Sequence, residues 1–398
     1  MTHLRTTPLR LAALLLTLMP LSLMARSFQK PQKYRIGLDS QSVVIADVNG
    51  DGKPDLVIAD FGSVGVVLGN GDGTFQPEAL FASGGQDVAA VAVGDLNGDG
   101  KLDIVAANLE TNTIGVLLGN GDGTFQPVQT YSSGGSTPFA IAVADLNGDG
   151  KLDVIVNNLW CGTSCNHSAA GVFLGNGDGT LQSPNVFDSG TARAIAVADV
   201  NGDGKLDLLV AGDSAAGVML GNGDGTFGAL VNYSAGNNRG TSIAVADVNG
   251  DHKLDLIVTF GCGQGAGGCS PGQVAVFQGN GDGTFQPFVE YSTGAQNAMS
   301  VAAVDVNHDG KIDLVVANYC ALKDKYCIAS GVVSVLLGRG DGTFKTPQLL
   351  GSGGTWAVSV AVADVNGDKK PDIVVINQLR AYYHALYGVA SVLLNSIP

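Results

Sequence analysis

The stretch Asp47-Val48-Asn49-Gly50-Asp51-Gly52-Lys53-Pro54-Asp55 sets a pattern that recurs six more times, in order, along the 398 residues of this chain. Every copy keeps Asp at positions 1, 5 and 9, Asn at position 3 and Lys at position 7. Side-chain oxygens at positions 1, 3, 5 and 9, with the backbone carbonyl of position 7, follow the ligand order of an EF-hand loop in shortened form. Position 6 is Gly in five copies, which suits a sharp turn around an ion. The pattern therefore predicts a calcium loop in each copy, up to seven Ca²⁺ sites in all.

The candidate Ca²⁺ ligands are the five odd-numbered positions of each copy. They are Asp47, Asn49, Asp51, Lys53, Asp55, Asp95, Asn97, Asp99, Lys101, Asp103, Asp145, Asn147, Asp149, Lys151, Asp153, Asp199, Asn201, Asp203, Lys205, Asp207, Asp247, Asn249, Asp251, Lys253, Asp255, Asp305, Asn307, Asp309, Lys311, Asp313, Asp364, Asn366, Asp368, Lys370 and Asp372. At position 6, His252 and Lys369 replace Gly in the fifth and seventh copies. We expect a positive φ angle there, which costs energy for a residue with a side chain, so these two sites should bind most weakly.

The copies start 48 to 59 residues apart, and self-similarity at such a period indicates a propeller or a solenoid. The third repeat contains four short runs of β-type residues, at 140–144, 154–158, 171–174 and 185–187, and no amphipathic helical pattern. Four strands per repeat is the composition of a propeller blade.

The two ends of the chain indicate how the repeats close. The seventh repeat stops near residue 395, after its third strand, and lacks the fourth. Residues 28–37 match residues 125–134 of the second repeat, with Phe, Gln, Tyr and Gly at equal spacing. We therefore expect the N-terminal strand to complete the last repeat, which closes a ring and removes its exposed sheet edges. A linear solenoid would instead carry polar caps at both ends.

The pattern Asp-x-Asn-x-Asp-Gly-x-x-Asp after an Ala/Val strand resembles the FG-GAP and VCBS repeats. These repeats build the calcium-binding seven-bladed propeller of integrin α subunits and of many exported bacterial proteins. The resemblance covers residues 28–398. It implies an all-β fold, a seven-bladed β-propeller of four-stranded blades, as a single domain over residues 26–398. In integrins only some blades carry the loop, whereas here all seven do.

The first 25 residues read as a secretory signal peptide. Arg5 and Arg10 precede an apolar run from Leu11 to Met24 that is too short to span a membrane, and Ala25 is a small residue suited to cleavage. This predicts a secreted protein, extracellular or periplasmic, with no membrane insertion. The chain has 36 acidic and 21 basic residues, and this balance argues against nucleic acid or an anionic membrane surface as a partner.

Six cysteines fall in lengthened loops between the second and third strands of the third, fifth and sixth repeats. In an exported chain they predict three local disulfides, Cys161 with Cys165, Cys262 with Cys269 and Cys320 with Cys327. A zinc site at Cys161, Cys165 and His167 is an alternative, but it offers only three ligands.

The face of the propeller that bears the cysteine loops differs from repeat to repeat. We expect a recognition surface there formed by Tyr319, Tyr326, Tyr382, Tyr383 and His384, because aromatic rings beside polar groups suit protein or sugar recognition. The alternative is that these aromatic residues only cover the ends of the blades.

The opposite face carries the candidate calcium loops and Asn-Gly-Asp-Gly turns such as 70–73. Asp72 and its counterparts in the sister turns could add metal ligands, although Asn-Gly and Asp-Gly are strong hairpin signals by themselves. Arg339-Gly340-Asp341 spells the tripeptide of integrin ligands, but it stands where five sister turns have Asn-Gly-Asp, so turn chemistry explains it.

No catalytic constellation is evident in the sequence. His167 and His384 lie in different repeats, and neither has a nucleophile motif beside it. We therefore expect a non-enzymatic, monomeric, calcium-binding propeller that serves as a binding or adhesion module for an extracellular glycan or protein. The second hypothesis is a carbohydrate-active enzyme, a lyase or hydrolase, which would need a carboxylate pair or a metal-held water. The third is a structural subunit of a surface complex.

Overall fold

The computed structural model describes residues 27–160, 167–261, 271–322, 330–378 and 387–397. These residues form β-strands and turns, as the sequence predicts, and none of the helices that a membrane crossing would need occurs among them. The strands are β1 (Gln32–Leu38), β2 (Ser42–Ala46), β3 (Asp55–Asp60), β4 (Ser63–Val67), β5 (Ala79–Ala82), β6 (Val88–Gly94), β7 (Asp103–Asn108), β8 (Thr113–Leu117), β9 (Gln129–Ser132), β10 (Ser136–Ala144), β11 (Asp153–Trp160), β12 (Ser168–Phe173), β13 (Asn185–Gly190), β14 (Ala192–Ala198), β15 (Asp207–Met219), β16 (Val231–Ala246), β17 (Asp255–Gly261), β18 (Pro271–Phe277), β19 (Val289–Val304), β20 (Asp313–Ala321), β21 (Val332–Leu336), β22 (Gln348–Gly351), β23 (Trp356–Ala363), β24 (Asp372–Gln378) and β25 (Tyr387–Leu393).

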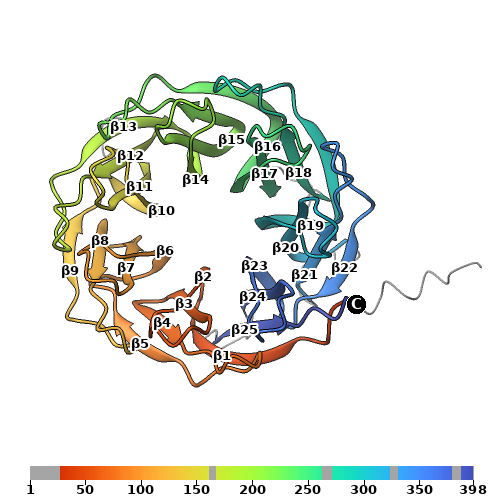
Figure 1. Cartoon of the computed structure of the whole chain (residues 1–398), viewed down its shortest axis with the longest axis horizontal. Helices are drawn as coiled ribbons and strands as arrows, with labels where there is room; N and C mark the ends of the chain where they lie inside the picture. The colour runs from red at the N-terminus through yellow and green to blue at the C-terminus, as the bar shows by residue number, and fades with distance from the viewer. Residues whose placement is uncertain (1–26, 161–166, 262–270, 323–329, 379–386, 398) are drawn as a thin grey trace, which may run out of the picture.

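The strands form antiparallel sheets arranged around a central opening (Figure 1). Strands β2 to β5, β6 to β9 and β10 to β13 each make a four-stranded sheet in chain order. Strands β14 to β22 run on as one sheet because β16 and β19 are long and bend from one four-stranded unit into the next. For example, β16 pairs with β15 mainly through residues 231–234 and with β17 through residues 239–246. Strand β15 is also long, but it pairs with β14 through residues 207–212 and with β16 through residues 213–218 of the same unit. A four-stranded unit repeated around an axis is the architecture of a β-propeller.

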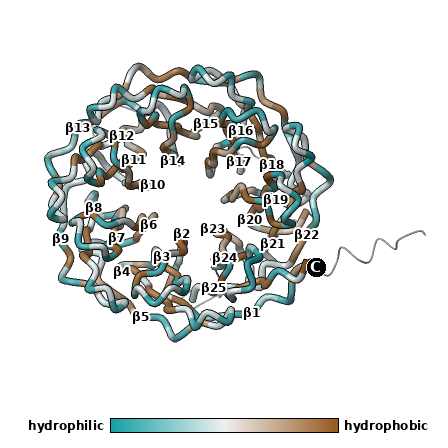
Figure 2. The backbone as a smooth tube through the Cα atoms, viewed as in Figure 1, coloured by the Kyte–Doolittle hydropathy of each residue, from teal (hydrophilic) through white to brown (hydrophobic). Residues whose placement is uncertain are grey.

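The hydrophobic core lies between neighbouring sheets. All six residues of β3 are buried, and so are all six of β7, because both faces of each strand pack against another sheet. Val57 and Val66 of one sheet, for instance, share a cluster with Ile104 of the next. The strands nearest the opening are largely apolar in Figure 2. Burial on both faces explains why β3 and β7 are nearly continuous runs of Val, Ile, Leu and Ala between their polar ends.

The N-terminal strand β1 pairs antiparallel with β25, so the last sheet has the order β1-β25-β24-β23. An isolated bridge between Phe28 and Asn395 repeats the bridge that Gly69 and Phe75 make in the first repeat. The sequence match of residues 28–37 to residues 125–134 therefore correctly predicts that the N-terminal strand joins the last sheet.

A buried pair of carboxyl groups lies where the last sheet meets the first. Asp60, at the end of β3, is 1% exposed and accepts a hydrogen bond from the Ser40 hydroxyl. The Oδ2 atom of Asp60 and the Oε1 atom of Glu78 are both buried without a hydrogen-bond partner. Burial raises the pKa of both carboxyls, and the charge of Asp60 raises that of Glu78 further. The raised pKa values favour a proton on this pair over two bare carboxylates.

Candidate metal loops and a candidate ligand pocket

Each nine-residue loop is folded by its own side-chain oxygens. In the first loop, Asp47 accepts hydrogen bonds from the backbone N–H groups of Asp51 (3.1 Å) and Gly52 (2.7 Å). Asn49 Oδ1 accepts from Asp51 N–H at 2.9 Å, and Asp51 Oδ1 accepts from Lys53 N–H at 3.0 Å. The same bonds recur in the second loop. An amide or carboxylate oxygen that accepts one N–H keeps a lone pair for a cation, so these bonds leave the oxygens able to bind metal.

Position 9 of the loop is buried and has a structural role that the sequence reasoning missed. Asp55 Oδ2 accepts from Val48 N–H at 3.0 Å, and its Oδ1 accepts from Gly69 N–H at 2.7 Å. The carboxylate thereby ties the start of the loop to the end of the third strand. The same two bonds are made by Asp103, Asp153, Asp207, Asp255, Asp313 and Asp372. In the last copy the second donor is the N–H of Asn395.

The loops offer the donor chemistry of a calcium site. Burial raises the pKa of the Asp55 carboxyl, backbone hydrogen bonds oppose this, and the nearby charges of Asp47 and Asp51 raise it further. Carboxylate, amide and carbonyl oxygens around this negative charge are the ligands that a hard divalent cation prefers. Within the ranges that the structure describes, however, no three His, Cys, Asp or Glu side chains converge as a formed metal centre. Lys53 also lies 3.2 Å from Asp51. The residues fit Ca²⁺ by chemistry, and their side chains would have to gather around it.

The backbone at position 6 has a positive φ angle in the fifth and seventh loops. It is 63° at His252 and 66° at Lys369, compared with 79° at Gly52. The sixth loop has a strained residue that sequence reasoning overlooked, because His308 stands at position 4 with φ 57°, where the first loop has Gly50. Its ring lies 3.0 Å from the Lys369 carbonyl oxygen of the next loop. We expect the sixth site to share the weakness predicted for the fifth and seventh.

The Asn-Gly-Asp-Gly turns are closed by their own hydrogen bonds. Asp72 Oδ1 accepts from the Thr74 N–H at 2.9 Å, and the Asn70 amide donates to the Thr74 hydroxyl. Asp341 makes the same bond to Thr343. Turn chemistry thus accounts for Asp72 and for the Arg-Gly-Asp tripeptide.

The predicted recognition face is only partly described. Tyr319 of β20 stacks on Trp356 of β23, with ring centroids 4.9 Å apart and planes 16° apart. Cys320 is disulfide-bonded. The other predicted residues of this face, and the signal peptide 1–25, lie outside the described residues: Cys161, Cys165, Cys262, Cys269, Cys327, Tyr326, Tyr382, Tyr383 and His384.

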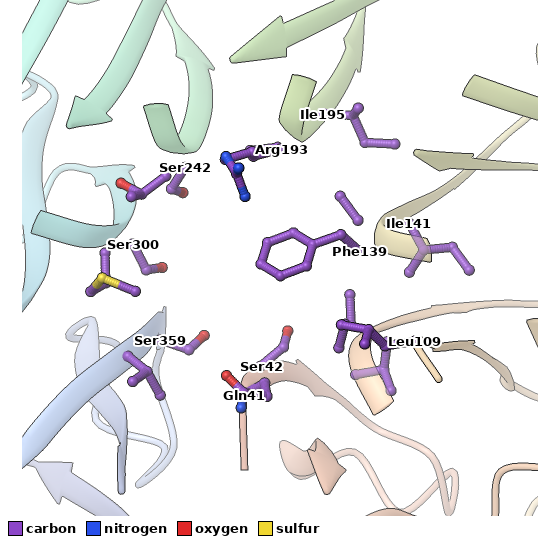
Figure 3. Close-up of a pocket in the computed structure, with 18 of the residues that line it drawn as sticks. Gln41, Ser42, Leu109, Phe139, Ile141, Arg193, Ile195, Ser242, Ser300 and Ser359 are labelled. Atoms are coloured by element: carbon purple, nitrogen blue, oxygen red, sulfur yellow. The ribbon is translucent and has the colours of Figure 1, made fainter. Parts of the chain in front are cut away.

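A cavity of about 330 Å³ lies in the central opening, at the ends of the innermost strands opposite the loops (Figure 3). Its lining includes one residue from each repeat, the sixth before the first Asp of each loop. These are Gln41, Ala89, Phe139, Arg193, Thr241, Met299 and Val358, and we call them the axial ring. All seven members are different residue types, three of them apolar and non-aromatic, whereas the next residue along each strand is always Ser or Ala. Sequence reasoning missed the axial ring, although an alignment of the seven copies contains the signal.

A second cavity of about 300 Å³ adjoins the first and shares Phe139, Arg193, Thr241 and Met299 with it. In Figure 3, Phe139 and Arg193 point into the same opening. The axial ring therefore presents an aromatic ring and a cation side by side, each at the point where the register of its innermost strand shifts.

Comparison with known proteins agrees with this architecture. The family model of the FG-GAP-like repeat matches residues 47–106, 95–156, 159–210, 199–258, 266–316 and 322–375. The chain therefore belongs to the FG-GAP repeat family. Among solved structures, it is similar to an Agrocybe aegerita lectin whose structure is described as the basis of specific recognition of non-reducing terminal N-acetylglucosamine. The two share 22% identity with a TM-score of 0.55, over 84% of this chain and 85% of the lectin. No curated protein sequence matches the chain.

Proposed function

We propose that this protein is a closed seven-bladed propeller that acts outside the cytoplasm as a non-enzymatic module for binding a glycan, with Ca²⁺ held in its repeated loops. The observation that carries the proposal is the contrast between a regular scaffold and the variable axial ring at its centre. Recognition needs residues that differ from one another, and the axial ring places one such residue per repeat around a common cavity.

Closure is supported by contacts that cross from the first repeat to the last. Gly73 N–H donates to the Val365 carbonyl at 3.0 Å, as Gly179 N–H does to Leu96 between the second and third repeats. Val43 N–H donates to the Ser359 hydroxyl at 3.3 Å across the same junction. Together with the pairing of β1 and β25, these hydrogen bonds join the first and last units by the same kind of contact that joins other neighbouring units.

Binding is favoured over hydrolysis by the lining of the cavity. Asp87 is the carboxylate among the described residues that line it. Glycoside hydrolysis commonly uses two carboxylates that flank the scissile bond. A glycan is favoured over a protein ligand because the similar Agrocybe aegerita structure is a lectin. The cavity volume of about 330 Å³ also lies at the lower end of the volumes that small-molecule binding sites have.

The test is a glycan array probed with the purified mature chain in calcium and in EDTA. We expect binding to a restricted set of glycans, with weaker binding in EDTA because the blades that carry the site loosen. The Phe139→Ala variant should lose the same signals, and Phe61→Ala, an exposed aromatic outside the cavity lining, is its control. Binding of no glycan by a folded protein would exclude the proposal. Cleavage of a glycan would favour the enzyme hypothesis.

A further inference from the structure

Two arginines share one carboxylate at the mouth of the central opening. The Nε atoms of Arg193 and Arg239 lie 3.4 Å and 3.7 Å from the same Asp213 Oδ1. Arg193 comes from β14, whereas Asp213 and Arg239 come from β15 and β16 and are paired across those two strands. Two guanidinium groups and one carboxylate leave one positive charge uncompensated. This positive charge stands out in a chain with a formal net charge of −15.

The Arg193 guanidinium is poorly solvated where it lies. Its side chain is 21% exposed, compared with 55% for that of Asp213. Burial lowers the pKa of Arg193, and the positive charge of Arg239 lowers it further, while Asp213 opposes both. A cation that has lost water and faces another cation gains most from an additional anion.

The guanidinium groups are also suited to a second carboxylate by their geometry. The contacts with Asp213 use the Nε atoms. The guanidinium group has five N–H donors in a planar fork, which can hold another carboxylate in bidentate fashion. Both arginines line the second cavity together with Phe139, and Arg193 also lines the first.

The remaining lining suits a sugar ring better than a bare anion. Phe139 is 36% exposed and presents an aromatic ring beside Arg193 (Figure 3). An exposed ring in a cavity offers rigid apolar contact area. Gln41 and Asp87 line the same cavity and can exchange hydrogen bonds with hydroxyl groups.

We propose that the two adjoining cavities at the axial ring together bind a carboxylated sugar unit, with its carboxylate on Arg193 and Arg239 and its ring against Phe139. This inference rests on the proposed glycan-binding function and names the class of glycan. Asp213 acts as an internal competitor for the two arginines.

The experiment is calorimetric titration of the mature protein with matched oligosaccharides that end in glucuronic acid or glucose, and in galacturonic acid or galactose. Within each pair, the carboxylate is the difference. We expect the acidic member to bind at least about tenfold more tightly, as a charge-assisted bidentate contact allows. Arg193→Gln and Arg239→Gln should each remove most of that preference.

Asp213→Asn separates recognition from folding, because its effect has the opposite sign. Removing the competing charge should raise the affinity for the acidic sugar, whereas damage to the fold would lower it. Arg339→Gln is the matched control. It removes a cation of equal charge from a turn among the loops, and it should leave binding unchanged.

The outcomes separate this inference from the proposed function. Equal affinity for acidic and neutral sugars, unchanged in Arg193→Gln, would overturn the inference and leave glycan binding intact. Binding of an acidic peptide in place of either sugar would overturn both, as would binding of no glycan by folded protein.

Discussion

The innermost strand of each repeat carries a different kind of residue at each of its two ends. At the loop end, the residues are nearly the same in all seven copies, and they make the same hydrogen bonds, as Asp55 and Asp103 do. At the other end, the axial ring varies from Ala89 to Arg193 on equivalent backbone positions. The difference teaches that the loop end is constrained by folding and by the proposed metal binding, while the axial ring is free to vary, as the proposed recognition role requires.

Several loops are hydrogen-bonded to a turn of the neighbouring repeat, as Val365 is to Gly73. Separating the first repeat from the last should therefore lower the stability of the fold more than any other change. Deleting residues 28–37 removes β1 and leaves β25 with an open edge. We expect aggregation or loss of cooperative unfolding, measured by size-exclusion chromatography and a thermal melt. A soluble monomer with an unchanged melting temperature would show that the chain closes in another way.

Calcium removal should have the next largest effect. Each filled loop stabilises the folded state by RT ln(1 + [L]/Kd), which is about 1.4 kcal/mol at ten times Kd, and several loops add together. We expect a large fall in melting temperature in EDTA, restored by Ca²⁺. If the melting temperature stays the same after metal analysis has verified removal, the loops are not calcium sites that stabilise the fold.

The buried position 9 separates folding from metal binding within the loop. Asp103→Ala leaves the N–H groups of Leu96 and Gly119 without their acceptor, which should cost about 2 kcal/mol or more of unfolding free energy. Because these bonds need no metal, most of the loss should persist in EDTA, as denaturant unfolding can measure. The exposed turn residue Asp122 provides the control, and its Ala variant should lose about 1 kcal/mol or less. A loss that disappears in EDTA would assign Asp103 to metal alone.

The smallest change in stability is expected from a substitution in the buried pair of Asp60 and Glu78. Both pKa values are raised on folding, that of Asp60 to about 6 and that of Glu78 to about 9. The folded state therefore binds protons more tightly than the unfolded state, and the pair's contribution to stability is lost as pH rises toward 9. In Glu78→Gln the amide supplies the hydrogen permanently, so the melting temperature should fall less between pH 7 and pH 9 than in the parent. Identical pH profiles would mean that the pair does not share a proton.

The sequence predicts two kinds of feature: those that recur in every repeat, and those that depend only on residues close together in the chain. The loop pattern gives the family, and the match of Phe28 to Phe125 gives the partner of β1, because equivalent residues of a repeat fold alike. The second role of Asp55 could not be predicted, since its donor at Gly69 lies 14 residues away across two strands.

The pocket was harder to predict for a related reason. Within its own strand, Phe139 reads as an ordinary apolar residue, and only the ring geometry places it beside Arg193. Arg193, Asp213 and Arg239 meet because three strands adjoin, and no local pattern signals that meeting. Pairwise contacts between distant residues depend on topology, which the repeat pattern implies only in outline.

In our proposal, the loop end of each innermost strand serves folding and the axial ring serves binding. The most direct test titrates two matched variants, in saturating Ca²⁺, with the glycan that binds best on the array. Asn97→Ala changes the loop end of the second repeat, and Phe139→Ala changes the axial ring. The account predicts that Asn97→Ala melts at a lower temperature but binds the ligand with unchanged affinity, whereas Phe139→Ala melts normally and loses at least about tenfold in affinity, as expected for a central aromatic contact. The account is contradicted if Asn97→Ala abolishes binding while folded and Phe139→Ala binds as the parent does.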